Sequence, residues 1–399
     1  MFDPVPIRAH FPALSVCVHG RPLVYLDNAA TAQMPQSVAD AAAQIELRRG
    51  NVHRGIHALS EDCTAAYENA RAVTAAFIGA APEQITFTSG TTDAVNRIAD
   101  SFRRQLGPDD AIVVTQMEHH SNFIPWQQLC RDTGSELRVL PLTARGELDL
   151  DALDSMRSGK VKLVAVTHIS NVLGTVNDVK QICALAHQAG AQVFVDGAQG
   201  ICHLPVDVEE LGCDYYAFSG HKLGAPFGTG ALYARRPYRP VRYGGGMVEE
   251  VRVQHTTFAP APLGWEAGTP NVSGAAGMAE ALRFRQSLPQ GWQDWEDRLL
   301  KRAEDGLDSM PGIRVLGTPQ ARAGCLSFVI EGASPFDAAV LLDQLGIALR
   351  SGHHCAQPLL HSLGLDYALR ISPAFYNTAE EIDTFLNALS RVRTICALR

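Results

Sequence analysis

The sequence predicts an α/β protein: a large, doubly wound, mainly parallel sheet with a smaller α+β domain at the carboxyl end. Between about residues 84 and 235, short β-branched runs alternate with amphipathic helical segments. Several of these runs are apolar almost throughout, as expected of strands that are covered on both faces. After residue 272 the alternation gives way to a long helical segment and then to mixed strands and helices.

Seven short runs in the first part of the chain are predicted to be strands. They lie at residues 84–90, 111–117, 136–142, 162–169, 192–197, 215–220 and 230–235. A helix is predicted to begin at Asn177–Asp178 and to end at Gly190. Its apolar face consists of Val179, Ile182, Cys183 and Ala186.

The segments after residue 233 differ from the first part of the chain in composition and in predicted secondary structure. Residues 234–272 are rich in proline and glycine, which favours an irregular functional stretch. Residues 273–308 are predicted to be helical and to join two domains. The predicted division is a large domain at 20–280 and a small domain formed by 1–19 together with 281–399.

The small domain is expected to contain strands at 324–330 and 369–372. A helix is predicted to begin at Ser334–Pro335 and to end at Gly346. Thr378 and Glu381 form a predicted capping box at the start of the last helix.

Composition limits the function classes. The chain has 399 residues and a formal net charge of −8, which gives no electrostatic basis for binding nucleic acid. The first ten residues lack the basic start and apolar stretch of a signal peptide, and no apolar run approaches the ~18 residues of a membrane helix. Nine scattered cysteines without a CxxC pair favour a reducing compartment. We therefore expect a cytoplasmic protein that binds neither nucleic acid nor membrane.

Unusual residues follow three of the predicted strands, where open α/β sheets bind ligands. Ser89–Gly90–Thr91–Thr92 stands at the start of a predicted helix. Small hydroxyl residues and a glycine at this place are typical of a phosphate-binding site, but an ordinary N-cap would explain them as well. Asp196 ends a buried strand and serves either as a helix cap or as the partner of a protonated pyridine nitrogen. Lys222 lies just past a strand, between Gly220 and Leu223–Gly224, with no acid near it in sequence. It should be poorly solvated there and have a lowered pKa, which suits Schiff-base chemistry; the alternative is a lysine on a surface loop. In this order the three sites are typical of PLP enzymes of fold type I.

The chain as a whole resembles the group II cysteine desulfurases, the SufS and CsdA type within the class V aminotransferase superfamily. The resemblance runs nearly end to end and rests on many motifs. They are YLDNAAT (25–31), NVHRGIH (51–57), SGTTDAVN (89–96), MEHHSN (117–122), HISNVLGT (168–175), VDGAQG (195–200), FSGHKLG (218–224), GGGM (244–247), EAGTPN (266–271), RSGHHCAQPL (350–359) and YNT (376–378).

The resemblance implies pyridoxal 5′-phosphate (PLP) as cofactor, with Lys222 as the lysine that binds it covalently and Asp196 as its pyridine partner. Gln199 would contact the phenolic oxygen of PLP, and His119 would stack on the ring. The phosphate would be held by Thr91, Thr92, Ser219 and His221, with Thr269 reaching in from the other subunit of a homodimer.

For the substrate, the resemblance implies that Arg370 binds the carboxylate, assisted by Asn171, and that Cys355 accepts sulfur. The pocket would also be lined by His53, Arg54, Arg350 and His354. The implied reaction converts L-cysteine to L-alanine with a persulfide on Cys355. The sulfur would pass to a SufE- or SufU-like acceptor for iron–sulfur cluster assembly.

Alternatives remain at the level of sequence. A selenocysteine lyase acting on L-selenocysteine, or another aminotransferase-like member of the superfamily, would use the same cofactor. A catalytically silent sulfur-trafficking or scaffold protein would keep only the fold. Zinc binding by His119–His120 and His353–His354–Cys355 is disfavoured, because adjacent histidines chelate poorly, and we expect no metal.

Eight cysteines are expected to be packing residues, and Cys355 is distinguished from them by its polar, irregular surroundings. They are Cys17, Cys63, Cys130, Cys183, Cys202, Cys213, Cys325 and Cys396. One departure from the family concerns the segment after Lys222, which reads LGAPFG where the family commonly has LYGPTG. Loss of the aromatic residue and gain of Phe227 are expected to reshape the cofactor wall or the dimer interface.

Overall fold

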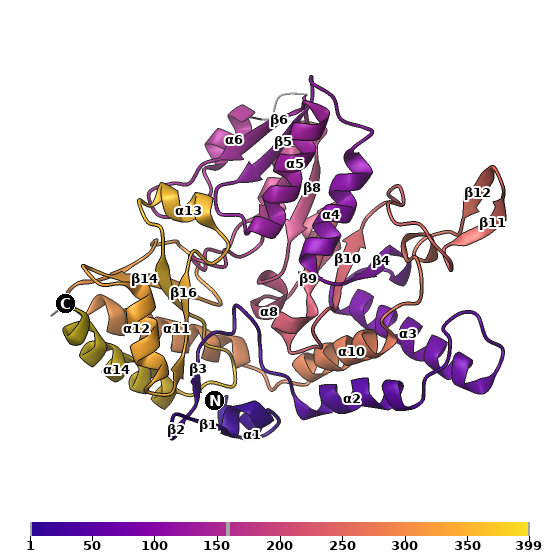
Figure 1. Cartoon of the computed structure of the whole chain (residues 1–399). Helices are drawn as coiled ribbons and strands as arrows, with labels where there is room; N and C mark the ends of the chain where they lie inside the picture. The colour runs from indigo at the N-terminus through magenta and orange to yellow at the C-terminus, as the bar shows by residue number, and fades with distance from the viewer. Residues whose placement is uncertain (1, 157–159, 398–399) are drawn as a thin grey trace.

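A computed structural model describes residues 2–156 and 160–397 of the chain. A seven-stranded sheet forms the centre of the fold (Figure 1). The strand order is β4–β10–β9–β8–β7–β5–β6. Strands β5 to β9 pair in parallel, and β10 runs antiparallel to both β9 and β4. The predicted mainly parallel sheet is confirmed, with strands at Ile85–Thr88 (β4), Ala111–Thr115 (β5), Glu136–Leu140 (β6), Val161–Thr167 (β7), Gln192–Asp196 (β8), Tyr215–Ser219 (β9) and Gly230–Ala234 (β10).

Both faces of this sheet are covered, as the apolar strands require. Alternate side chains of β5 enter different clusters: Val113 packs in the cluster that contains helix α7, and Val114 packs in the cluster that contains α4 and α5. The predicted helix is α7 (Val179–Gln188), its four apolar residues are buried, and Asp178 caps it by accepting from Gln181 N. The helices on the other face are α4 (Thr91–Phe102) and α5 (Ile124–Thr133).

Three longer helices lie side by side along one end of the molecule (Figure 1). They are α2 (Gln36–Leu47), α3 (Ala58–Phe77) and α10 (Val272–Gln286). Shorter elements connect the large-sheet region: η2 (Pro82–Gln84), η3 (His120–Asn122), α6 (Leu150–Met156), α8 (Gly200–His203), α9 (Val208–Leu211), η4 (Gly220–Leu223), β11 (Val248–Arg252), β12 (His255–Phe258) and η5 (Leu263–Trp265).

A four-stranded sheet with order β13–β14–β17–β16 forms a second layer near the carboxyl terminus (Figure 1). Its strands span Ile313–Val315, Leu326–Ile330, Ala368–Ile371 and Arg350–Gly352, in the same order. The helices of this region are α11 (Trp292–Asp308), α12 (Pro335–Asp343), α13 (Gln357–Ser362) and α14 (Ala379–Ala397). The amino-terminal elements are α1 (Pro4–Arg8), η1 (Pro12–Ser15), β1 (Cys17–Val18), β2 (Arg21–Pro22) and β3 (Val24–Tyr25), and β3 pairs with β15 (Ile347–Ala348).

The predicted capping box before α14 is confirmed by two reciprocal hydrogen bonds. Thr378 N donates to Glu381 Oε2 at 3.0 Å, and Glu381 N donates to Thr378 Oγ1 at 3.3 Å. The predicted domain boundaries at 19/20 and 280/281 stay predictions.

Three expectations need correction. Residues 234–272 are not irregular throughout, because β11 and β12 form a hairpin there; its residues are largely exposed, so no apolar alternation marked it. The helical stretch 273–308 is two helices, since α10 ends at Gln286 and α11 begins only after Pro289 and Gly291. Cys17 is exposed and is not a packing cysteine.

Within the described residues, none of the helices is both long enough and apolar enough to cross a membrane.

Candidate active site

A cavity of about 260 Å³ lies where the large sheet meets the four-stranded sheet. Strand ends of both sheets contribute to its wall, because β8 and β9 end there and β16 and β17 supply arginines. Twelve of the residues singled out from the sequence line it: Thr91, Thr92, His119, Asn171, Asp196, Ser219, His221, Lys222, Arg350, His354, Cys355 and Arg370.

Hydroxyl groups and a helix amino terminus form one end of the cavity. Ser219 Oγ, at the end of β9, accepts from Thr91 N at 2.9 Å and lies 2.9 Å from Thr91 Oγ1. Gly90 caps α4 with φ of 146°, and a Cβ there would come within 3.1 Å of Ser219 Oγ. A close-packed turn that opens a twelve-residue helix is a suitable site for an anion.

A lysine and a buried carboxylate lie in the same cavity. Asp196 accepts a hydrogen bond from Ala198 N at 2.9 Å, and the described residues give its carboxylate no other. Burial raises the pKa of Asp196, and the positive charge of Lys222 opposes this effect. Burial lowers the pKa of Lys222, against the opposing influence of Asp196. An amine whose pKa is lowered is available in part as the neutral nucleophile that condenses with a carbonyl group.

His119 lies at the cavity as a neutral imidazole. Burial, reinforced by the charge of Lys222, lowers the pKa of His119 to about 3. Its Nδ1 accepts from Ser121 N at 3.1 Å, which makes Nε2 the protonated nitrogen. Burial likewise lowers the pKa of His221 to about 4. Neither ring is charged at neutral pH, so both can contact a ligand without repelling Lys222.

Two arginines face each other across antiparallel strands, Arg350 on β16 and Arg370 on β17. Directly opposed like charges destabilise a sheet, and both arginines line the cavity, so the pair favours an anion between them. Arg370 is 2% exposed; its Nη1 donates to Asn171 O at 2.8 Å and its Nη2 to Asp27 Oδ1 at 3.1 Å. These bonds fix the plane of the guanidinium group.

Cys355 is half-buried and sits on a turn with unusual backbone geometry. His354 and Cys355 have φ of 52° and 53°, in the left-handed region that residues other than glycine seldom adopt. Such a conformation persists only where its surroundings hold it. Cys355 N donates to His353 Nδ1 at 3.0 Å, and Cys355 O accepts from His120 N at 2.7 Å.

The same turn is attached to both sheets. Asn171 Nδ2 donates to His354 O at 2.8 Å, and His354 Nε2 lies 3.1 Å from the carbonyl oxygen of Ala368. The following helix α13 packs with Leu359 and Leu360 in the core cluster of the large sheet. Asn171 therefore links the two parts of the site. Its backbone carbonyl accepts from Arg370, and its side-chain amide donates to the turn that carries Cys355.

Four predicted residues lie outside this cavity in the single chain. Gln199 is buried, and its Nε2 donates to Ala29 O at 2.8 Å. His53, Arg54 and Thr269 are exposed, and His53 Nε2 lies 2.9 Å from Glu68 Oε1. The roles assigned to these four residues stay predictions.

Two residues that sequence reasoning did not single out belong to the site. Ser121 lines the cavity, and its Oγ lies 2.7 Å from Thr92 Oγ1 and 3.0 Å from His119 Nδ1. Asp27 forms the ion pair with Arg370. Both lie within motifs that carry the family resemblance, but their own contacts could not be inferred from the linear sequence.

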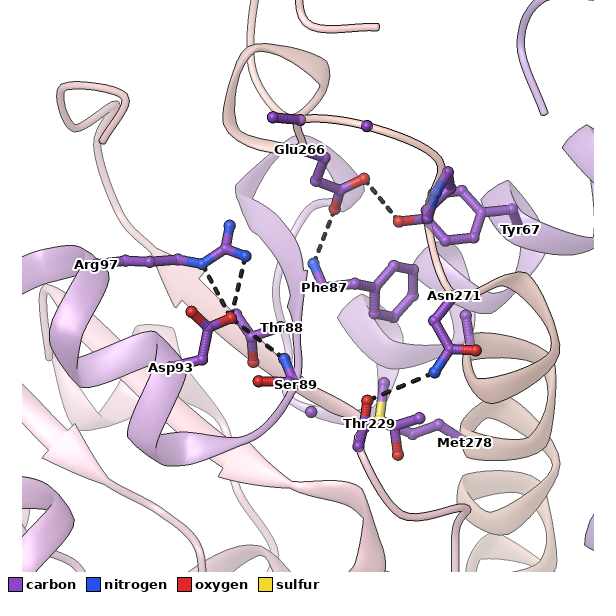
Figure 2. Close-up of a pocket in the computed structure, with 16 residues that line it drawn as sticks. Tyr67, Phe87, Thr88, Ser89, Asp93, Arg97, Thr229, Glu266, Asn271 and Met278 are labelled. Atoms are coloured by element: carbon purple, nitrogen blue, oxygen red, sulfur yellow. Dashed lines mark hydrogen bonds and ion pairs between the residues drawn. The ribbon is translucent and has the colours of Figure 1, made fainter. Parts of the chain in front are cut away.

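A second cavity of about 210 Å³ borders the Thr88–Ser89 turn (Figure 2). Glu266 accepts from the hydroxyl of Tyr67 at 2.7 Å and from Phe87 N at 2.8 Å, while Arg97 pairs with Asp93. Among the described residues its lining includes neither lysine nor cysteine. This cavity lacks the nucleophiles of the first one.

The segment after Lys222 does not enter the first cavity. Gly224 has φ of 84°, and a Cβ there would approach Gln33 O at 2.7 Å, which explains a glycine at this position. Phe227 is 76% exposed, with its ring centroid 5.9 Å from that of His221. In residues 2–156 and 160–397, no three His, Cys, Asp or Glu side chains gather so as to hold a metal ion.

Comparison with known proteins adds an independent observation. A family model described as aminotransferase class-V matches residues 24–385. A probable cysteine desulfurase of Mycolicibacterium paratuberculosis is 44% identical over 98% of this chain, which spans 58% of that protein's length. A probable cysteine desulfurase of Halalkalibacterium halodurans is also 44% identical, over 97% of both chains.

Solved structures agree with this relationship. The cysteine desulfurase CsdA of Escherichia coli, in an S-sulfonic acid form, superposes with a TM-score of 0.92 at 40% identity, covering 99% of this chain and 100% of that one. A cysteine desulfurase of Thermococcus onnurineus gives a TM-score of 0.93 at 37% identity, covering 99% of each chain.

Proposed function

The chain belongs to the class-V aminotransferase family and, within it, to the cysteine desulfurases, and from this membership we propose that it converts L-cysteine to L-alanine and receives the sulfur on Cys355 as a persulfide. The observation that carries the proposal is the single cavity that contains Lys222, Arg370 and Cys355. These residues supply an amine, a carboxylate-binding cation and a sulfur acceptor. The three groups come from segments far apart in the sequence.

The donor set fits PLP, the general cofactor of the family. The α4 turn, with Thr91, Thr92 and Ser219, offers backbone and hydroxyl donors for a phosphate. Within the described residues, the Asp196 carboxylate accepts one hydrogen bond, and this leaves it able to pair with a protonated ring nitrogen. Neutral His119 has a ring that can pack against an aromatic face without introducing charge.

Each residue has a defined task in the proposed reaction. When bound, PLP supplies an aldehyde that links to amines and a protonated ring that draws electrons from the substrate Cα. Asp196 keeps the ring nitrogen protonated, because an anion buried beside it favours the positive charge. Arg370 binds the carboxylate of the substrate and so fixes the orientation of the substrate. Lys222 would hold the cofactor through Nζ, and the same atom would remove the Cα proton of the substrate.

Sulfur transfer falls to Cys355. Its Sγ, as the thiolate, attacks the sulfur of the substrate; the new S–S bond forms as the Cβ–S bond breaks, and the carbon skeleton leaves as L-alanine after protonation. The hydrogen bonds that hold the 353–355 turn support this role, because they restrict where Sγ can lie.

The direct test is product analysis. Purified protein given L-cysteine and excess thiol reductant should release alanine and sulfide in equal amounts, because one persulfide is formed and reduced for each alanine. Alanine and sulfide would be measured in the same samples. Sulfide without alanine, or neither product from protein that has been supplied with PLP, would refute the proposed function.

We further propose a homodimer in which Thr269 of one chain approaches the phosphate of the other. Thr269 is exposed and does not line the cavity of its own chain. Large apolar side chains are exposed in the region of α2, α3 and the segment after Lys222, which favours a covered surface. They include Leu47 (85% exposed), Ile56 (98%) and Phe227 (76%).

Hybrid dimers would test this arrangement. Lys222→Ala and Thr269→Asp homodimers should both be inactive, the second because a carboxylate repels the phosphate. A 1:1 mixture of exchanging chains should recover about a quarter of wild-type activity, since about half of the dimers are hybrids with one intact site. Activity would be followed during subunit exchange. An active monomer in sedimentation, or no recovery despite exchange, would contradict shared sites.

The physiological steps that follow are part of the same proposal. A SufE- or SufU-like acceptor would collect the persulfide for iron–sulfur cluster assembly in the cytoplasm. The half-buried Cys355 on a firmly held turn supports the need for a specialised acceptor, because such a thiol cannot reach far from the cavity.

A further inference from the structure

Glu118 is a fully buried carboxyl group to which the proposed reaction gives no task. It is 0% exposed and lies next to His119, between β5 and η3. Burial, with a further contribution from the charge of Asp196, raises the pKa of Glu118 to about 8. Burying a carboxyl group is costly, so its presence beside the cavity calls for a specific reason.

Three hydrogen bonds hold this carboxyl group, and each comes from a different element. Glu118 Oε1 accepts from Thr115 Oγ1 at 2.6 Å and from Thr167 N at 2.8 Å, and Oε2 accepts from Asn122 Nδ2 at 2.6 Å. Thr115 ends β5, Thr167 ends β7 and Asn122 ends η3. One side chain therefore joins two strand ends to the turn that follows His119.

The strand end held by Glu118 is the neighbour of Asp196. Thr167 is the register partner of Asp196 on the adjacent strand β8, and the next residue, His168, donates its N–H to Asp196 O at 2.9 Å. On the other side, Asn122 N donates to His119 O at 2.8 Å. Glu118 is thus two contacts away from both the ring-stacking and the pyridine-binding groups of the proposed PLP site.

We propose that Glu118 is a positioning residue that sets the distance between His119 and Asp196, and thereby the gap into which the cofactor ring fits. The inference rests on the proposed function, since it concerns PLP. It assigns Glu118 no contact with cofactor or substrate.

The hydrogen-bond polarity around Glu118 allows a stringent test. Each carboxyl oxygen accepts from a nitrogen donor, Oε1 from Thr167 N and Oε2 from Asn122 Nδ2, so Glu118→Gln must turn its –NH₂ toward one of these two donors. Asn122 cannot rotate its amide to adapt, because its Oδ1 accepts from Trp126 Nε1 at 2.9 Å. One donor–donor contact is therefore unavoidable in the single variant.

The double variant Glu118→Gln/Asn122→Asp removes this conflict by exchanging the two groups. One oxygen of the new aspartate accepts from the glutamine –NH₂, and the other accepts from Trp126 Nε1–H. Asn122→Asp alone places a second carboxyl group against Glu118, and the proton that the raised pKa leaves on Glu118 at neutral pH can bridge the two, so this variant should be less harmful than Glu118→Gln. The four proteins form a double-mutant cycle around one hydrogen bond.

Asp214→Asn is the matched control. Asp214 Oδ2 also accepts a backbone N–H at a strand terminus, that of Val193 at 2.8 Å, together with His187 Nε2 at 2.8 Å. Asp214 precedes β9 and Val193 lies near the start of β8, so this pair lies at the amino ends of these strands, and the cavity lies at their carboxyl ends. Its loss should lower thermal stability without affecting cofactor binding.

Apoprotein of each variant would be titrated with PLP and followed by visible circular dichroism, with thermal unfolding measured in parallel. Glu118→Gln should weaken PLP binding about tenfold and diminish the visible dichroism, and Asn122→Asp should have the smaller effect. The double variant should return to within about threefold of wild type. Asp214→Asn should melt earlier with unchanged dichroism.

Wild-type binding and dichroism in Glu118→Gln would overturn the inference, and so would a double variant as impaired as Glu118→Gln. A wild-type apoprotein that takes up no PLP would instead refute the proposed function, so the two failures are distinguishable.

Discussion

Lys222→Ala is expected to abolish both the visible absorption of the purified protein and its turnover of L-cysteine. Lys222 is the one lysine among the described residues that line the cavity, so the covalent link to the cofactor has no substitute. It is also the proposed base at Cα, and a positioned general base contributes roughly 10²–10⁴-fold. The absorption spectrum and the rate of alanine formation would be compared with wild type.

Lys162→Ala provides the comparison for that experiment. Lys162 lies on β7 of the same sheet, with its Nζ 3.5 Å from Asp110 Oδ1, and its side chain is 44% exposed. Surface ion pairs contribute little to stability, so this variant should keep colour and activity. Full activity in Lys222→Ala would refute the PLP mechanism outright.

Cys355→Ser should reduce alanine formation from L-cysteine by about 10³-fold or more, as expected when a catalytic nucleophile is removed. A serine hydroxyl stays protonated near neutral pH and cannot take the substrate sulfur. The steps before sulfur transfer depend on Lys222 and Arg370, so the spectral response to added L-cysteine should persist. Stopped-flow spectra and alanine analysis on the same variant would separate the two stages.

Two cysteine variants serve as controls. Cys17→Ser changes an exposed thiol, and Cys325→Ser changes a buried thiol whose Sγ lies 3.6 Å from Ser170 O. Both should retain catalysis, with any loss in Cys325→Ser confined to stability. Mass spectrometry of wild-type protein after reaction with L-cysteine should place the additional sulfur on the peptide that contains Cys355. Label on another cysteine would refute the assignment.

The same variant distinguishes a desulfurase from a selenocysteine lyase. Selenium leaves carbon more readily than sulfur, so Cys355→Ser should lose much less activity toward L-selenocysteine than toward L-cysteine. Equal activity of wild type and Cys355→Ser toward L-cysteine would contradict persulfide formation on Cys355.

Local signals in the sequence predicted most of the elements, because each depends on neighbouring residues. The seven strands of the large sheet were recognisable from apolar β-branched runs, helix α7 from the spacing of Val179 and Ile182, and the start of α14 from Thr378 and Glu381. The hairpin of β11 and β12 was missed, because its exposed residues carry no periodic burial.

By itself, then, the sequence determined the fold class, the order of the strands along the chain, and the family, through motifs whose residue types are required by the chemistry. Only the tertiary structure decided which of those motifs meet. It brought Cys355 to Lys222 by docking α13 on the core of the large sheet, paired Arg350 with Arg370 across β16 and β17, and left Thr269 outside the cavity. It also gave Glu118 three hydrogen-bond partners from three elements. The physical reason is that hydrophobic periodicity acts within a segment, whereas the contacts of a polar side chain depend on strand order, register and burial, which form only when distant segments pack together.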